Sequence, residues 1–491
     1  MLFNTIDFVI FFFLVVGIIT ILKYRRFQHI FIIFASVFFL YYTNSYLIVI
    51  LIFTILFHYY IGRQIYKADS KDGKKIFLIA GLAGSLGLLG FFKYADFAIA
   101  QFNIFGNIMD LGSEIPLLNF ALPIGISFYT FQSISYIIDI YRGNLTPSKT
   151  LREYAFFVAF FPTLVAGPIL RARQFLPQLR EKIEQSNTTG RLRQFVIQHS
   201  NLKFGLTLMA LGFLKKMFFA DNIGLLVDKI FSNPIGMESF SIMLGAIAFG
   251  IQIYCDFSGY SDIAIGAAAI FGFKIPLNFN KPFFATSPTD YWKRWHISLS
   301  TWVRDYLYFP LAFKHRKSDV VVYSSLMISM VLMGLWHGAS WNFLIWGGIH
   351  GIFLATHTIL RRRYPRITLH PFFQKNIGKL FSIVITQYLM FFTFIAFRVK
   401  DFDHMLYSMN KYIFIDFATT KTIEIIKENE FAISLMVLFA ALHFISFKQG
   451  NLAEKISKFK LRFWVLFLAV IFLSIALFYV GSAQEFIYFE F

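Results

Sequence analysis

The sequence predicts an all-α polytopic membrane protein with about eleven transmembrane helices and one or two re-entrant elements. Hydrophobic residues make up 57% of the 491 residues and charged residues only 15%, whereas a soluble domain carries about 25% charged residues. The 66 phenylalanines present more apolar surface than one water-soluble core can bury. Apolar runs of membrane-spanning length recur along the chain and are separated by basic segments, as in multi-pass proteins.

The first apolar runs predict three membrane helices. Residues 8–22 are apolar and no basic residue precedes them, so we expect a retained helix rather than a cleaved signal peptide. The run 31–61 is too long for one crossing and breaks near residues 43–45, which predicts a hairpin of two short helices. Its basic flanks, 23–27 and 63–75, are then both cytoplasmic, and the N-terminus is outside.

The next region combines two crossings with an irregular segment. Residues 76–92 and 122–140 are expected to cross outward and back. Residues 154–170 contain two prolines and are flanked by arginines, which predicts a re-entrant element. Irregular backbone at membrane depth survives only inside protein or beside a wet cavity, so a cavity is expected. Residues 171–200 are polar and predict a cytoplasmic loop.

Further apolar segments complete the predicted membrane region. They are an amphipathic stretch interrupted by two lysines, 203–232, and the runs 240–273, 320–360, 380–397, 431–447 and 463–479. Residues 274–318 mix prolines with charges, which predicts a cytoplasmic or re-entrant segment. The basic stretch 455–462 places the start of the last helix inside, so the C-terminus is expected outside.

The net charge of +19 agrees with this topology. A strongly basic protein can bind nucleic acid, but these basic residues lie between apolar runs and no soluble basic domain is visible. We therefore expect membrane lipid, and no nucleic acid, among the partners. The single cysteine, Cys255, excludes an intramolecular disulfide and a multi-cysteine metal site, and no metal is predicted.

His337 is the strongest candidate for a chemical role. It lies near the middle of the 320–360 run, and ionisable residues at membrane depth are costly and usually functional. Gly334 and Gly338 flank it at four-residue spacing, which allows close backbone approach. The alternative is a histidine hydrogen-bonded to a neighbouring helix, with glycines that serve ordinary helix packing.

A second candidate segment combines indoles, cations and a histidine. It comprises Trp292, Lys293, Arg294, Trp295 and His296, followed by Arg304. Its cations can meet an anionic group such as a nucleotide phosphate, while the tryptophans stack on the ligand or anchor at the interface. An amphipathic interfacial helix with snorkelling cations is the alternative.

The apolar stretch 254–262 carries two aspartates, two serines and two tyrosines, which are costly there unless they line a cavity. We expect Asp256 or Asp262 to orient an imidazole or to pair with Arg294 or Arg304. Two aspartates make a weak metal site, because no neighbouring histidine or glutamate completes a ligand set.

Several motifs in a fixed order resemble those of the membrane-bound O-acyltransferase family, and most closely its bacterial alginate O-acetylase branch. They are 122–132 (LPIGISFYTFQ), 166–169 (AGPI), 254–262 (YCDFSGYSD), 278–283 (NFNKPF), 292–300 (WKRWHISLS) with 304–306 (RDY), and 334–338 (GLWHG). The resemblance implies one membrane domain over residues 1–491, with a family-like core at about 90–350 and C-terminal helices at 380–491.

The same resemblance implies a ring of tilted helices around a membrane-embedded reaction chamber, open to a cytoplasmic donor and an external acceptor. His337 is then the catalytic histidine and His296 the second signature histidine. The candidate donor- or substrate-binding residues are Trp292, Lys293, Arg294, Trp295, Arg304, Asp256 and Trp336.

The implied activity is O-acetyl transfer in the bacterial cytoplasmic (inner) membrane. An acetyl group would move from a cytoplasmic thioester, acetyl-CoA, to hydroxyls of an alginate-like exopolysaccharide or peptidoglycan. A periplasmic or surface acetyltransferase would be the partner, and no bound cofactor is expected. His337 would be the general base, a role that suits an imidazole titrating near neutrality.

The last six residues resemble the terminal tyrosine motif of envelope acylation systems. Tyr488 is then predicted to accept the acyl group and pass it to an extracytoplasmic partner, with an aromatic interfacial anchor as the alternative. The competing function for the whole chain is a transporter or lipid-linked-sugar flippase with His337 and Asp256 as a proton relay, because mid-membrane ionisable residues suit both classes.

Overall fold

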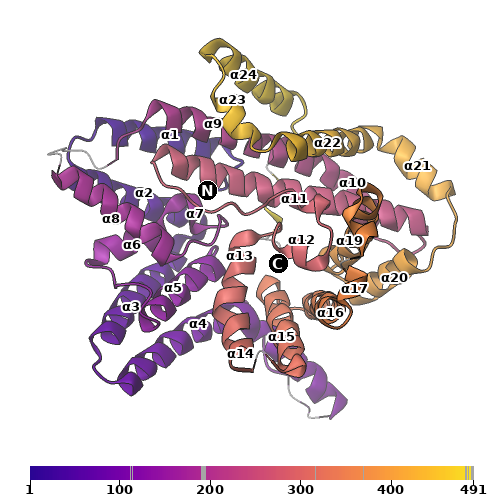
Figure 1. Cartoon of the computed structure of the whole chain (residues 1–491), viewed down its shortest axis with the longest axis horizontal. Coiled ribbons are helices and arrows are strands. Elements are labelled where there is room, and N and C mark those ends of the chain that lie inside the picture. The colour runs from indigo at the N-terminus through magenta and orange to yellow at the C-terminus, as the bar shows by residue number, and fades with distance from the viewer. Residues whose placement is uncertain are drawn as a thin grey trace. The chain divides into compact units, whose positions relative to one another are not determined.

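The computed structural model describes most of the chain as helix, with short turns and extended connections (Figure 1). It describes residues 1–491 except 111, 113, 189–194, 316, 369, 482–483, 485 and 488–491, and the side chains of 25, 26, 43, 44, 186–188, 314 and 368. No strand occurs among the described residues. The predicted all-α class is confirmed.

Seven helical segments among the described residues are long and apolar enough to cross a membrane. They are Ser45–Lys67 (which includes α3, Ile48–Lys67), α4 (Lys71–Ile108), α11 (Ser239–Ile270), α15 (Asp319–His337), α16 (Trp341–Arg363), α19 (Asn376–Arg398) and α22 (Glu430–Gln449). Shorter apolar helices are α1 (Ile6–Ile21), residues Phe27–Tyr42 within α2 (Arg25–Asn44), and α24 (Leu461–Leu477). At 1.5 Å per residue these reach about 24 Å, close to the lower limit of a crossing.

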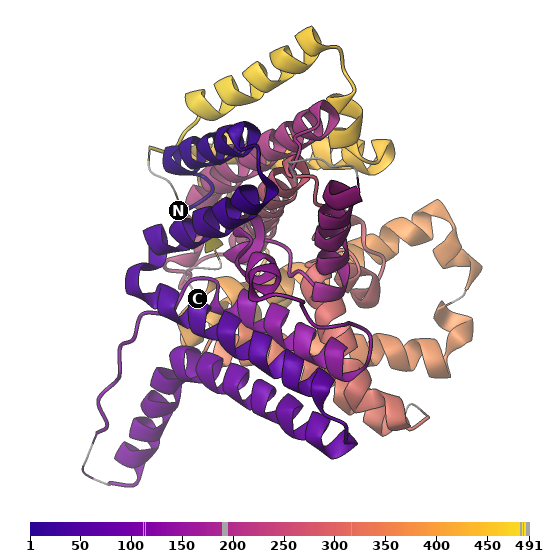
Figure 2. The same cartoon turned by 90° about the vertical axis from the view of Figure 1, so that its left-hand side faces the viewer.

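The helices form two compact units. The first unit comprises Met1–Leu206 with Ala264–Pro276, and the second comprises Thr207–Ile263 with Leu277–Phe491. In the first unit, α3, α4 and α5 (Ile126–Tyr141) pack side by side (Figure 2). The break expected near residues 43–45 is present, since α2 ends at Asn44 and Ser45 has a positive φ of 44°.

Two expectations for the first unit need correction. Helix α4 continues to Ile108, well beyond the predicted 76–92, because no proline interrupts it. Residues 171–200 are not simply a loop, because α8 (Ala172–Thr188) occupies much of that range. Although α8 is polar overall, it is amphipathic. Its apolar face packs inside the unit and buries Phe175, Leu176 and Leu179.

The irregular segment predicted at 154–170 is confirmed as an interruption. Helix α6 (Leu151–Ala159) ends at Phe160, and a single turn, α7 (Phe161–Leu164), follows it. Proline at the second position of α7 fits there because the first turn of a helix needs no backbone donor. The side chains of this segment are buried, as irregular backbone within a membrane requires.

The lysine-interrupted stretch forms one continuous helical rod. Helix α9 (His199–Phe213) passes through a π-helical turn (Leu214–Ala220) into α10 (Asp221–Phe231). Within the second unit the rod approaches α11 closely, since a Cβ on Gly212 would lie 2.6 Å from the carbonyl oxygen of Gly259. The π-turn carries the two lysines and points them at α11.

The 320–360 run is a helical hairpin rather than one long apolar segment. Helices α15 and α16 are joined by a turn at residues 338–340. The hairpin is tight, because a Cβ on Gly334 would lie 2.2 Å from the carbonyl oxygen of Phe343. At the opposite end, Arg362 and Arg363 pair with Asp319, both at 3.0 Å. His337 therefore lies at the tip of the hairpin, about 27 Å from Asp319 along the helix, and not in mid-helix.

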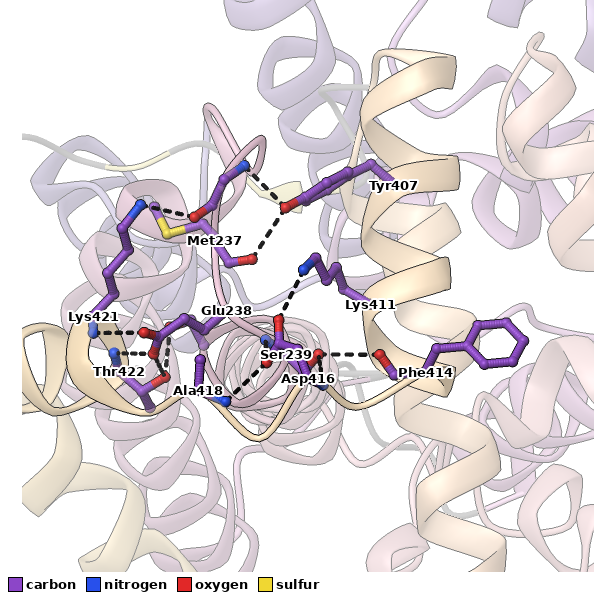
Figure 3. Close-up of polar contacts among 12 residues, drawn as sticks. Met237, Glu238, Ser239, Tyr407, Lys411, Phe414, Asp416, Ala418, Lys421 and Thr422 are labelled. Atoms are coloured by element: carbon purple, nitrogen blue, oxygen red, sulfur yellow. Dashed lines mark hydrogen bonds and ion pairs between the residues drawn. The ribbon is translucent and has the colours of Figure 1, made fainter.

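A polar clamp joins the start of α11 and the turn before it to α20 (Phe402–Ile413), the first turn of α21 (Thr420–Glu428) and the connection between these two helices (Figure 3). The Glu238 carboxylate accepts hydrogen bonds from the backbone N–H groups of Lys421 and Thr422, at 3.0 and 2.9 Å. Asp416 accepts one from the Ser239 N–H and pairs with Lys411 at 2.8 Å. That ion pair lowers the pKa of Asp416 to about 2.

Candidate functional site

His337 is buried in an aromatic wall at the tip of the α15–α16 hairpin. It is the last residue of α15, and its side chain is 5% exposed. The ring centroids of Trp336, Trp346 and Phe397 lie 4.9, 5.0 and 5.3 Å from that of the imidazole. Rings from α15, α16 and α19 therefore surround this histidine.

The first turn of α16 fixes the end of α19 beside this histidine. The side-chain amide of Asn342 donates hydrogen bonds to the carbonyl oxygens of Val399 and Lys400, at 2.6 and 3.1 Å. Carbonyls at a helix C-terminus have no partner within the helix, so the amide supplies one. Phe397 is thereby held against His337. Asn342 was not predicted from the sequence, because a single amide side chain near the start of a helix gives no distinctive signal.

His296 lies in the same unit and is joined to His337 through one indole. Its ring is 4.5 Å from Phe257 and 6.2 Å from Trp336, and Trp336 in turn contacts His337. It precedes α13 (Ile297–Val303), with a left-handed φ of 42°. Burial lowers the pKa of His296 to about 3, because a low-polarity surrounding disfavours the imidazolium. The structure thus brings the two predicted histidines together.

A third histidine, His350, extends the aromatic wall. Its ring lies 4.6 Å from Trp346 on the same helix and 5.1 Å from Trp292, the last residue of α12 (Pro288–Trp292). It is 2% exposed. His350 was not predicted as a site residue from the sequence. The four-residue spacing from Trp346, which places both rings on one helix face, was the available signal.

The predicted indoles are used for internal packing. Trp292 and Trp295 are 8% and 3% exposed. Trp295 stacks on Tyr291 with 5.5 Å between ring centroids. These two indoles are therefore buried within their unit, whereas Lys293 between them is exposed.

The predicted pairing of aspartates with arginines is wrong. Asp256 pairs with Lys216 at 2.7 Å, and Asp262 pairs with Lys215 at 2.6 Å. The π-turn directs both lysines at α11, a geometry that hydropathy alone does not reveal. The arginines pair locally instead, Arg294 with Asp290 at 3.0 Å and Arg304 with Asp305 at 2.7 Å, while Lys293 is exposed.

Lys216 lies at the centre of a buried charge cluster. Its ammonium also contacts Asp221 at 2.9 Å, and all three side chains are at most 4% exposed. The second carboxylate oxygen of Asp256 accepts a hydrogen bond from the backbone N–H of Ile487 at 2.9 Å. Removing two carboxylates from water is costly unless a cation compensates them, and Lys216 supplies that cation.

Residues near the C-terminus pack beside this cluster. Phe486 stacks on Tyr260 at 4.7 Å and contacts Phe257 at 5.4 Å, and Phe257 contacts His296. Tyr488, the predicted acyl acceptor, lies outside the described residues. No group of three or more histidine, cysteine, aspartate or glutamate side chains in the described part of the chain is placed to hold a metal ion.

Comparison with known proteins identifies the family of this chain. The model of the membrane-bound O-acyltransferase family matches residues 149–399, about half of the chain, and this region contains His296, His337 and the aromatic wall. The chain belongs to the membrane-bound O-acyltransferase family. The predicted resemblance is confirmed, and the chain is an O-acyltransferase and a multi-pass membrane protein.

Three relatives indicate the range of chemistry in this family. The chain is 33% identical over 436 residues to the peptidoglycan O-acetyltransferase of Helicobacter pylori, covering 83% of this chain and 78% of that protein. It is 42% identical over 320 residues to the probable alginate O-acetylase AlgI of Azotobacter vinelandii, covering 64% and 60%. It is 30% identical over 300 residues to the teichoic acid D-alanyltransferase of Bacillus subtilis, covering 59% and 72%. The chain therefore matches about three-fifths of the length of the Azotobacter relative.

Proposed function

We propose that this O-acyltransferase moves an acetyl group from acetyl-CoA to hydroxyls of an exported or cell-wall polysaccharide, with His337 as general base. The observation that carries the proposal is the buried imidazole at the hairpin tip, enclosed by Trp336, Trp346 and Phe397. The relatives named for acetylation of peptidoglycan and alginate support an acetyl group and a polysaccharide acceptor.

The chemistry follows from the weak nucleophilicity of a hydroxyl. His337 accepts the hydroxyl proton while the oxygen attacks the thioester carbonyl; the C–S bond then breaks and CoA leaves as its thiol after taking up a proton. Proton transfer of this kind typically contributes about 10²–10⁴-fold to the rate. The surrounding rings exclude water, which protects the thioester from hydrolysis.

The charge distribution supports a cytoplasmic donor and an external acceptor in the inner membrane. Arg361, Arg362 and Arg363 end the hairpin at the side opposite His337, and basic residues mark the cytoplasmic side. His337 then lies toward the outer side, with both termini outside. Lys293, Arg294 and Arg304 attract the donor phosphates from the cytoplasm, and Trp292, Trp295 and Trp336 wall the donor path.

We propose further that Tyr488 relays the acetyl group to a periplasmic or surface acetyltransferase. The residue before it, Ile487, is tied to Asp256, and Phe486 contacts the Phe257 ring that packs on His296. These contacts place Phe486 and Ile487 beside the side chains that surround His296. The phenol would lose its proton to the base and form an acetyl ester, which the partner then takes. Tyr488→Phe should abolish polymer acetylation, and normal acetylation in that variant would contradict the relay.

The test of the function is to incubate the purified full-length protein, in detergent or reconstituted vesicles, with acetyl-CoA labelled in the acetyl group. We expect release of CoA and transfer of label to the protein or to added polysaccharide. A transporter or flippase would leave the thioester intact. Intact acetyl-CoA in the presence of folded protein, polysaccharide and partner would contradict the proposal.

A further inference from the structure

Asn278 is a buried side chain with hydrogen bonds at both ends of its amide. It is 1% exposed. Its Nδ2 atom donates to Ser261 Oγ at 3.1 Å. Its Oδ1 atom lies 3.3 Å from the backbone nitrogen of Ser298, 2.9 Å from the Ser298 hydroxyl and 3.1 Å from His296 Nδ1.

These contacts determine which way the amide faces and which nitrogen of His296 carries a proton. A backbone N–H only donates, so the amide atom that faces Ser298 is the oxygen. The same oxygen faces His296 Nδ1, which must therefore be the donor. Burial keeps the imidazole neutral, and a neutral imidazole has a single N–H. The lone pair is consequently on Nε2.

Backbone hydrogen bonds also fix the chain on both sides of His296. The Ile297 N–H donates to the Asn278 carbonyl at 2.8 Å, and the Asn280 N–H donates to the Arg294 carbonyl at 2.9 Å. His296 has a left-handed φ of 42°, which costs about 1–3 kcal/mol in a residue other than glycine and persists only where the surroundings enforce it. The two backbone hydrogen bonds with Asn278 and Asn280 stabilise this conformation.

We propose that Asn278 is a positioning residue for acyl transfer, because it fixes the Nδ1-protonated tautomer of His296 and so leaves the lone pair of the ring on Nε2. This inference rests on the proposed function. The His296 ring is bounded by Phe257 and by Trp336, the indole that also contacts His337. His296 therefore places the lone pair of a neutral imidazole, a hydrogen-bond acceptor, in the same aromatic cluster as the proposed base His337.

The kinetic test compares Asn278→Ala with Asn278→Asp in the full-length protein. Alanine removes the acceptor, and we expect kcat to fall about 10- to 100-fold with the KM for acetyl-CoA within about twofold of wild type. Aspartate keeps an acceptor and adds a negative charge that favours the imidazolium. We therefore expect the acid limb of the kcat–pH profile to move to higher pH by about one unit, with kcat near wild type above it.

Two comparisons separate positioning from simple structural support. Ser300→Ala removes a hydroxyl of α13 that bonds Trp295 rather than Asn278, and it should leave both kcat and the pH profile unchanged. A merely structural Asn278 would lower the yield of folded protein in both variants while leaving kcat per folded molecule, and the pH profile of the aspartate variant, as in wild type. That result would overturn the inference.

The tautomer can be read without any activity. Solid-state NMR of the full chain with ¹⁵N-histidine, compared with His296→Gln to assign the signal, should show protonated Nδ1 and unprotonated Nε2 at His296. Asn278→Ala should redistribute that signal. Protonated Nε2 in the wild type would overturn the inference even if acetyl transfer is confirmed. The expected tautomer in a protein that consumes no acetyl-CoA would instead count against the proposed function.

Discussion

The imidazole of His337 packs edge to face against the indole of Trp346, with 5.0 Å between the ring centroids. The same indole lies 5.7 Å from Phe397 and 4.6 Å from His350. Edge-to-face pairs have a preferred geometry and contribute about 0.5–1.5 kcal/mol beyond burial. Trp346 thus fixes the orientation of the proposed base.

Replacing this indole should impair turnover more than donor binding. Trp346→Phe keeps an aromatic ring but leaves a gap beside His337, and a shift of about 1 Å in a catalytic group can cost about 100-fold. We expect kcat to fall about tenfold or more, with the KM for acetyl-CoA little changed. Steady-state kinetics of the purified protein provide the measurement. Trp341→Phe, at a half-exposed indole of the same helix, is the matched control.

The close approach of α15 and α16 should tolerate no added methyl group at its centre. A Cβ on Gly334 would lie 2.2 Å from the backbone oxygen of Phe343, whereas nothing lies within 4 Å of a Cβ on Gly348. Gly334→Ala should spread the hairpin, displace His337 and lower acetyl transfer at least tenfold. Gly348→Ala should retain wild-type activity. Equal activity of the two variants would show that the hairpin spacing does not control the site.

Removing the ammonium at the centre of the buried cluster should destabilise the protein strongly. Lys216→Met leaves Asp221 and Asp256 without their shared cation, and an uncompensated buried charge costs about 3–5 kcal/mol. Adding Asp221→Asn and Asp256→Asn should recover part of that loss. Thermal unfolding in detergent is the measurement. Lys229→Met, which breaks an exposed pair with Glu428, should cost about 1 kcal/mol or less.

Acid should weaken the polar clamp within a defined pH range. The pKa of Asp416 is lowered to about 2 by its pair with Lys411, whereas an unfolded aspartate titrates near 3.9. The pair therefore stabilises the fold fully above about pH 4, and that contribution disappears as the pH falls toward about 2. The unfolding temperature of the wild type should fall more steeply over this window than that of Asp416→Asn. Asp403→Asn, at an exposed residue of α20, should follow the wild type.

Much of the fold could be predicted from the sequence because hydropathy and basic flanks encode membrane helices directly. The breaks near residue 45 and at Phe160 also followed from local polarity and proline. The hairpin turn after His337 did not, because Gly338, Ala339 and Ser340 are small enough to leave the apolar average high. The π-turn at Leu214–Ala220 was likewise hidden, since its charges look like a simple interruption.

The candidate site was predictable only in part. His337 stood out through the rarity of histidine at membrane depth, His296 through the indoles and cations beside it, and both through the resemblance. The structure places both beside Trp336. The partners of Asp256 could not be predicted, because Lys216 lies 40 residues away and is brought to it only by helix packing. The role of Asn278 could not be predicted either, because it depends on contacts with Ser261 and His296 that only the folded chain brings together.

Acetyl transfer by the His337→Gln variant tests directly whether His337 is the general base. Glutamine approximates the size of histidine but cannot accept a proton near neutral pH, so folding should be retained. We expect wild type and His404→Gln to transfer label from acetyl-CoA to protein or polysaccharide. We expect His337→Gln, folded and in equal amount, to transfer at least about 100-fold less. Transfer by His337→Gln at the wild-type rate would contradict this role of His337.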